Sequence, residues 1–164
     1  MPSASSSFTG LVRKPTVLLA SGLGLGFIPV APGTFGTLEA FPVFWLLRMY
    51  FTSWALFGII VVLYLAGIFI CDRASRLSGI KDPAFVIWDE IICFLLVLLC
   101  SPVTWFWQLL AFALFRFFDI VKPGPIGYVD KKLGGGFGIM FDDFLASVAT
   151  ILILQFLAVF IVRM

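Results

Sequence analysis

Two pairs of adjacent carboxylates beside apolar segments are the residues in this chain best suited to do chemistry. Asp89 and Glu90 lie inside one apolar stretch, and Asp142 and Asp143 come just before another. Carboxylates gathered in a low-dielectric setting repel one another unless a cation joins them. A set of oxygen ligands favours Mg²⁺ over Mn²⁺ or Ca²⁺. The pattern therefore predicts a Mg²⁺ site, and Mg²⁺ is suited to phosphoryl chemistry.

Charged residues and glycines are concentrated in the segment from Phe115 to Phe144, which holds four of the nine acidic and four of the eleven basic residues. Unpaired charges and irregular backbone are costly in hydrocarbon, so this segment must leave the bilayer or line a polar cavity. We interpret it as an active site at the membrane surface. Arg116 and Lys122 would neutralise phosphate charges, and the glycines at 134–138 would let the backbone approach a head group.

Several of these residues also have a purely structural interpretation. Arg116 and Asp119 are three apart on a predicted helix and could simply pair with each other. Asp142 and Asp143 could cap the start of the last helix. Asp130, beside two lysines, is open to either interpretation.

Asp89 and Glu90 are harder to explain structurally, because adjacent carboxylates within an apolar helix indicate a functional site. Adjacent helical residues diverge by about 100°, which leaves open whether both reach one metal. Asp72 and Asp82 are expected in solvent or in pairs with nearby basic residues.

The uncharged segment from Gly22 to Thr37 holds five glycines and two prolines. Its backbone N–H groups could bind a phosphate, as anion-binding nests do. A kinked segment leading into the membrane is the alternative, and the residues leave both open.

The composition is that of an integral membrane protein. Hydrophobic residues make up 62% and charged residues 12%, the mean hydropathy is +1.13, and soluble domains are about a quarter charged. A net charge of +2 does not indicate nucleic-acid binding. Histidine is absent, and the three cysteines form no CxxC pair. We expect a polar tail at residues 1–14 and a single domain at residues 15–164.

The apolar segments predict an all-α membrane bundle with four to five membrane helices. The segments are a short helix at 38–49, a transmembrane helix at 49–71, a helical hairpin at 84–118 broken near Ser101 and Pro102, and a last span at 144–162. Lys and Arg mark three segments, whereas the turns near residues 52 and 101 carry none. These three segments are predicted to be cytoplasmic, which gathers every acidic cluster on that face.

Four sequence blocks together resemble bacterial phosphatidylglycerophosphatase A. The blocks are 24–38 with APGTFGTL, 82–90 ending in VIWDE, 115–126 with FRFFDIVKPGPI, and 130–143 with GGFGIMFDD. Three positions depart from the family pattern: Cys93 and Ser147 stand where glycine is usual, and Gly134 replaces a commonly larger residue.

The resemblance implies a Mg²⁺-dependent phosphatase at the cytoplasmic face of the bacterial inner membrane. It would act on the membrane lipid phosphatidylglycerophosphate in phosphatidylglycerol synthesis. The positions implied as catalytic are Asp89, Glu90, Asp119, Asp130, Asp142 and Asp143, of which Asp89, Glu90, Asp142 and Asp143 would hold metal. Those implied to bind substrate are Arg116, Lys122, Pro32, Gly33, Thr34, Gly36, Gly135 and Gly136.

The expected mechanism is in-line attack on the terminal phosphate by water bound to one or two Mg²⁺ ions, with Asp119 or Asp130 as base or orienting group. A covalent aspartyl-phosphate is the alternative. The competing functions are a phosphatase for another lipid phosphate, a non-catalytic lipid-binding subunit and a small transporter. A transporter would have no reason to collect its charges on one face.

Overall fold

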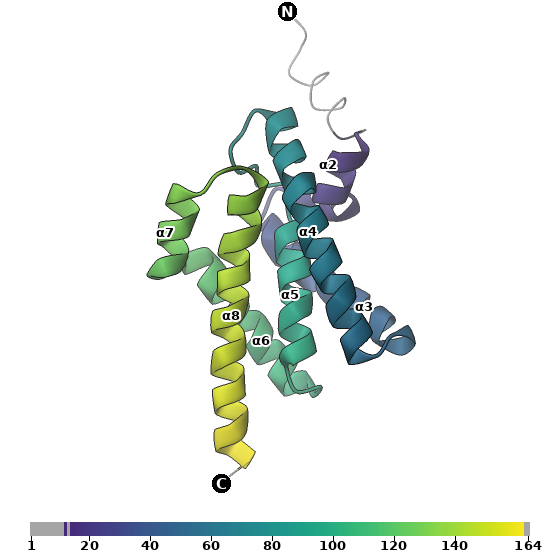
Figure 1. Ribbon diagram of the computed structural model, residues 1–164, viewed down its shortest axis with the longest axis vertical. Coiled ribbons are helices and arrows are strands. Elements are labelled where there is room, and N and C mark those ends of the chain that lie inside the picture. The colour runs from purple at the N-terminus through teal and green to yellow at the C-terminus, as the bar shows by residue number, and fades with distance from the viewer. Residues whose placement is uncertain (1–11, 13, 163–164) are drawn as a thin grey trace, which may run out of the picture.

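The computed structural model describes residues 12 and 14–162, and this part of the chain is helical with no strand. The tail predicted at residues 1–14 lies almost wholly outside the described residues. Figure 1 shows the arrangement of the helices. They are α2 (Pro15–Ala20), the 3₁₀ helix η1 (Gly22–Phe27), α3 (Pro32–Tyr50), α4 (Ser53–Ser78), α5 (Trp88–Cys100), α6 (Trp105–Val121), α7 (Pro125–Lys132) and α8 (Gly135–Val162).

Helix α5 is the centre of the bundle. It packs against α3, α4, α6 and α8, and most of its apolar side chains, including Phe94, Leu95 and Leu98, are buried. A helix that is apolar on all sides is expected in a core. Its thirteen residues span only about 20 Å at 1.5 Å per residue. The residues Ser101 and Pro102 separate α5 from α6, as the sequence predicted.

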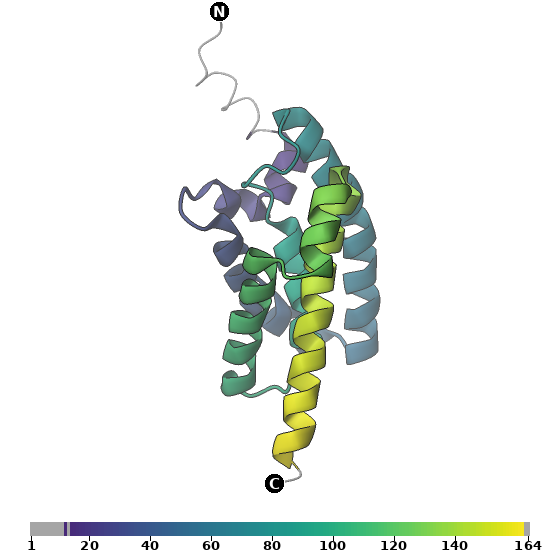
Figure 2. The ribbon, with the colours of Figure 1, turned by 90° about the vertical axis from the view of Figure 1, so that its left-hand side faces the viewer.

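Within the described part of the chain, two helices are long and apolar enough to cross a membrane: α4 at Ser53–Ser78 and α8 at Gly135–Phe160. The two helices pack against each other near the start of α8 and diverge toward its end, with α5 between them (Figure 1). The other helices are shorter or carry charge, so the expectation of four to five membrane helices stays a prediction. Figure 2 shows α8 as the longest helix, running from the charged segment to the C-terminus.

Two helices begin earlier than the sequence suggested. Helix α3 begins at Pro32 and α8 at Gly135, so residues expected in loops are helical. The reason at α8 is close packing: a Cβ at Gly136 would overlap the backbone of Ile68 in α4. Asp142 and Asp143 therefore lie within α8 and do not cap its start.

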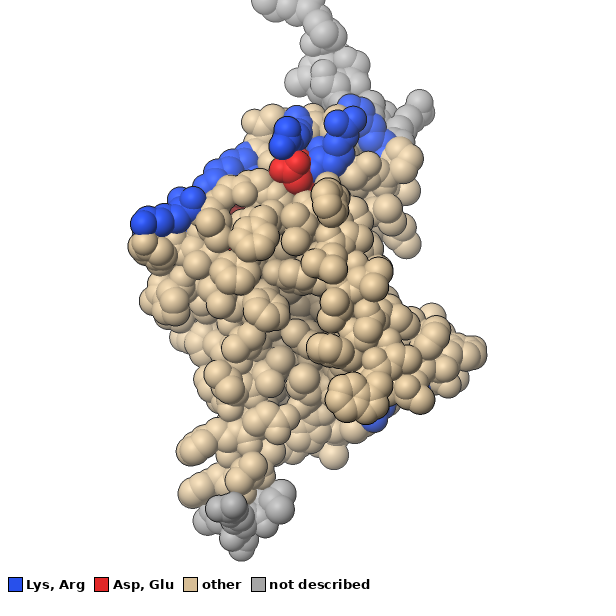
Figure 3. Space-filling model, viewed as in Figure 1, with Lys and Arg blue, Asp and Glu red and all other residues tan. Residues whose placement is uncertain are grey.

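Basic side chains gather at one end of the molecule (Figure 3). This end holds the last turns of α4, the loop that follows it, and α7, with Arg76, Lys81, Lys131 and Lys132 exposed there. Among the described residues, Arg48, in the last turn of α3, lies away from this end. The gathering agrees with the charge asymmetry expected from the sequence.

Candidate active site

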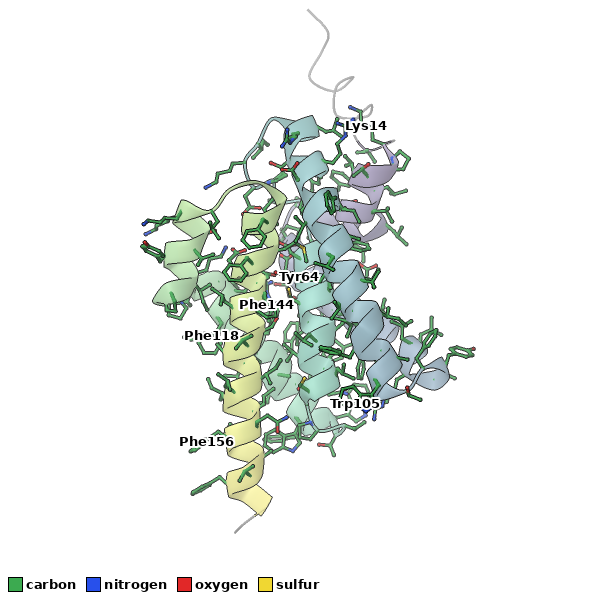
Figure 4. The ribbon with its side chains drawn as sticks, viewed as in Figure 1. Lys14, Tyr64, Trp105, Phe118, Phe144 and Phe156 are labelled. Atoms are coloured by element: carbon green, nitrogen blue, oxygen red, sulfur yellow. The ribbon has the colours of Figure 1, made fainter. Side chains whose placement is uncertain are left out.

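A polar cavity of about 200 Å³ lies where α3, α5, α6 and α8 meet near the charged end. Its walls bring together residues from four separate sequence blocks, beginning with the first turns of α3 and α5. Outside this cavity, the helices α4 and α8 are joined by an aromatic contact: the rings of Tyr64 and Phe144 pack with their centroids 5.6 Å apart (Figure 4). The charged residues that line the cavity are Asp82, Asp89, Glu90, Arg116, Asp119, Lys122, Asp142 and Asp143.

Three carboxylates in this cavity could hold a metal ion. One oxygen from each of Asp89, Glu90 and Asp143 lies within 4.8 Å of the others. Each of these residues also has a buried oxygen with no hydrogen-bond partner. Buried carboxylate oxygens are rarely left without a partner, and a set of oxygen ligands suits Mg²⁺. The residues present therefore fit a divalent cation, and both members of the adjacent Asp89–Glu90 pair reach the same site.

Arg116 is held beside these carboxylates by two helices. Its Nη1 atom lies 2.5 Å from Asp119 Oδ2 and 3.9 Å from Glu90 Oε1. The structural pairing of Arg116 with Asp119 does exist, yet both side chains line the cavity. A mostly buried guanidinium fixed by a carboxylate is well placed to bind an anion, because its remaining N–H groups are oriented in advance.

The first turn of α3 closes one wall of the cavity. Ala31, Pro32 and Gly33 line it, and the left-handed backbone of Ala31 (φ 47°) starts the helix there. Glu90 Oε1 lies close to the backbone of Gly33, and a Cβ at this position would overlap it. The free N–H groups of a helix start favour a negative charge nearby. The segment is also kinked at Leu23 and Gly24, so both interpretations of it stay predictions.

Thr37 links α3 to Arg116 and was not identified from the sequence. Its buried hydroxyl donates to the Gly33 carbonyl oxygen (2.9 Å) and accepts from Arg116 Nη1 (3.5 Å). This contact joins the guanidinium to α3.

Thr37→Val is expected to reduce kcat/KM for phosphate release about tenfold, because Arg116 loses a positioning partner. Thr150→Val is the matched control, since the Thr150 hydroxyl donates to Ala146 in the same way, away from the cavity. The midpoint temperature of thermal unfolding in detergent should fall by a similar amount in both variants. Equal activity in the two variants would contradict the role given to Thr37.

Lys122 joins two of the predicted acidic residues. Its Nζ atom lies 2.9 Å from Asp130 Oδ1 and also pairs with Asp142. Burial alone would lower the pKa of Lys122, but its hydrogen bonds to Asp142 and Asp130 outweigh burial and raise it. The hydrogen bond from Lys122 lowers the pKa of Asp130. Asp142 is therefore paired with a lysine through one oxygen and lies outside the three-carboxylate group. Its other oxygen is buried without a hydrogen-bond partner, and its role as a metal ligand stays a prediction.

The remaining residues predicted for the site do not line the carboxylate cavity. Gly36 packs against Ile87, and Thr34 is not among the lining residues. The Gly136 amide donates to Asp72 Oδ1 (3.4 Å), so it is directed at α4. Gly135 and Asp130 line a neighbouring cavity.

Asp82 was expected in solvent or in a pair with a nearby basic residue. It is exposed, and it also lines the carboxylate cavity, which the sequence did not indicate. Partial desolvation raises the pKa of its carboxyl group. The only signal in the sequence was its place at the start of the block at 82–90. Asp72, by contrast, pairs with Arg76 at 2.8 Å, as expected.

Comparison with known proteins gives one consistent family. The model of the family described as phosphatidylglycerophosphatase A matches residues 18–158. Proteins of that name from Escherichia coli and Haemophilus influenzae are 39% and 42% identical, over 89% and 85% of this chain and 85% and 86% of their own lengths. A "putative phosphatidylinositol-3-phosphatase" from Bacteroides thetaiotaomicron is 37% identical over 87% of this chain and 95% of its own length. No solved structure matches.

Proposed function

Because this chain belongs to the phosphatidylglycerophosphatase A family, and is therefore a phosphatase, we propose that it removes the terminal phosphate of phosphatidylglycerophosphate. The products are phosphatidylglycerol and inorganic phosphate. The observation that carries the proposal is the group of three buried or half-buried carboxylates, Asp89, Glu90 and Asp143, with oxygens within 4.8 Å of one another beside Arg116.

Asp89, Glu90 and Asp143 would hold Mg²⁺ in this proposal. When bound, the ion neutralises the clustered carboxylates and supplies positive charge to the phosphate and its attacking nucleophile. The unpartnered oxygens of these residues support this assignment. Without a cation, three carboxylates this close would be disfavoured by mutual repulsion.

The phosphate would be bound on its other side by Arg116 and the first turn of α3. Asp119 orients the Arg116 guanidinium, and Asp130 together with Asp142 orients Lys122. A water oxygen would add to phosphorus as the bond to the glycerol oxygen breaks. A cavity carboxylate would take the water proton and pass a proton to the departing glycerol oxygen, which leaves as an alcohol. An aspartate nucleophile that is later hydrolysed would form the same products.

The membrane arrangement belongs to the same proposal. Helices α4 and α8 would cross the bacterial inner membrane, with shorter helices completing four or five membrane segments. The basic end would face the cytoplasm, because Lys and Arg favour that side. This places the cavity opening at the level of lipid head groups.

A second lipid phosphate substrate is favoured by one comparison, since the Bacteroides thetaiotaomicron relative is named for phosphatidylinositol 3-phosphate. Both named substrates carry a phosphomonoester on a polyol that is joined to the lipid through a phosphodiester. The alternatives are therefore close in chemistry and differ in the polyol.

Phosphate release by the purified protein in neutral detergent with Mg²⁺ tests the proposal. The substrates would be phosphatidylglycerophosphate, phosphatidylinositol 3-phosphate and phosphatidic acid with identical acyl chains. We expect the highest kcat/KM for phosphatidylglycerophosphate. Higher kcat/KM for phosphatidylinositol 3-phosphate would favour the second substrate, and no release from any lipid by folded protein would refute a phosphatase of this class.

A further inference from the structure

A second and larger cavity lies directly beside the carboxylate cavity. Its volume is about 400 Å³, and it shares Asp82 and Asp142 with its neighbour as lining residues. Because two residues belong to both walls, the two cavities form adjoining compartments. A ligand bound in one could therefore extend into the other.

The larger cavity brings together two lysines from different parts of the chain. Lys81 belongs to the loop after α4, and Lys131 belongs to α7. Neither forms a salt bridge with any described residue, whereas the lining residues Asp130 and Asp142 are both paired with Lys122. Two lysines thus face a single unpaired carboxylate, Asp82, and the compartment can accept a negatively charged group.

The two compartments differ in the charge they can accommodate. The smaller one offers metal-binding carboxylates and Arg116, which suits a phosphomonoester with two negative charges. The larger one offers Lys81 and Lys131, and Lys122 already pairs with two of its three carboxylates, which suits a singly charged phosphodiester. Lys81 and Lys131 are exposed. Basic side chains gather at one end of the molecule (Figure 3), where a bilayer's own phosphodiesters would lie in the proposed orientation.

We propose that Lys81 and Lys131 form a subsite for the phosphodiester of the lipid substrate while the terminal phosphate occupies the carboxylate cavity. This inference rests on the proposed function. It adds a reason for substrate selection, because lipids with both a phosphodiester and a phosphomonoester would be favoured over lipids with a monoester alone. A group that does not react is bound equally well in the substrate and in the transition state. Binding it therefore lowers KM and leaves kcat largely unchanged.

The test compares the parent with the double variant Lys81→Met and Lys131→Met, which keeps the side-chain length and removes both charges. For phosphatidylglycerophosphate in neutral detergent, we expect KM to rise about tenfold to about a hundredfold with kcat little changed. For phosphatidic acid, which has no phosphodiester, kcat/KM should not change. Lys132→Met is the matched control, because Lys132 is the neighbouring lysine of α7 and does not line the cavity.

A second measurement covers the case in which phosphatidic acid is hydrolysed too slowly to measure. Glycerophosphoglycerol carries the phosphodiester alone, and its inhibition constant should weaken in the double variant by a factor similar to the rise in KM. Unchanged KM, unchanged inhibition, or equal losses for both lipids would overturn the subsite. If the parent releases no phosphate from phosphatidylglycerophosphate, the proposed function itself fails, which is a different result.

Discussion

Replacing Asp89 with asparagine is expected to lower kcat for phosphate release about a thousandfold. Asp89 is buried, has an unpartnered oxygen, and belongs to the group of three carboxylates that would hold the ion. An amide retains one oxygen but loses the negative charge, so the ion would be bound weakly and the phosphate charge would be poorly neutralised. The measurement is phosphate release at saturating lipid over a range of Mg²⁺ concentrations.

The same substitution at Asp72 is the control, since Asp72 lies outside the carboxylate cavity and pairs with an exposed Arg76. Asp72→Asn should keep kcat close to that of the parent. Without metal, Asp89→Asn should unfold at a temperature equal to or above that of the parent, because it removes one of three mutually repelling charges. If Asp89→Asn retained full activity, Asp89 would not be a ligand.

Gly33→Ala is expected to reduce kcat/KM about a hundredfold, although it adds only one methyl group. The added Cβ would overlap Glu90 Oε1 and lie 3.1 Å from Arg116 Nη1. Both side chains must move, and a displacement near 1 Å of a catalytic group can cost about a hundredfold. The expected loss comes from geometry, because Gly33 lies within α3 and needs no special backbone conformation.

Gly58→Ala provides the comparison for this variant. Gly58 lies in α4, and a Cβ there would meet nothing within 4 Å. Alanine in a helix is favoured over glycine, so this change should leave activity intact and raise stability slightly. Equal activity of Gly33→Ala and Gly58→Ala would show that the first turn of α3 does not form part of the active site.

The central acidic cluster could be predicted from the sequence because its charged residues lie within or beside apolar segments. Asp89 and Glu90 are charges within an otherwise apolar helix, and Asp143 precedes a long apolar run. Such charges are costly in hydrocarbon, so their presence indicates a shared polar site. The partners of Arg116 and Lys122 were less predictable, because pairs across helices depend on how the helices pack.

The glycine-rich segments show where sequence reasoning reached its limit. Glycines near 33 and 136 suggested loops that approach a phosphate, yet both positions are helical and allow close contacts with Glu90 or with α4. Glycine frequency indicates close approach but not which group approaches. Asp82 and Thr37 were missed for a related reason, since only the folded arrangement brings them to the cavity.

Restoring Mg²⁺ to metal-free protein while following phosphate release from phosphatidylglycerophosphate is the most direct measurement. Purified protein treated with EDTA is predicted to be inactive, and added Mg²⁺ should restore release along a saturable curve. The Mg²⁺ concentration that gives half-maximal release should be higher in an Asp143→Asn variant, because Asp143 contributes an oxygen to the same group of carboxylates. Full release in the presence of EDTA would contradict a metal held by Asp89, Glu90 and Asp143.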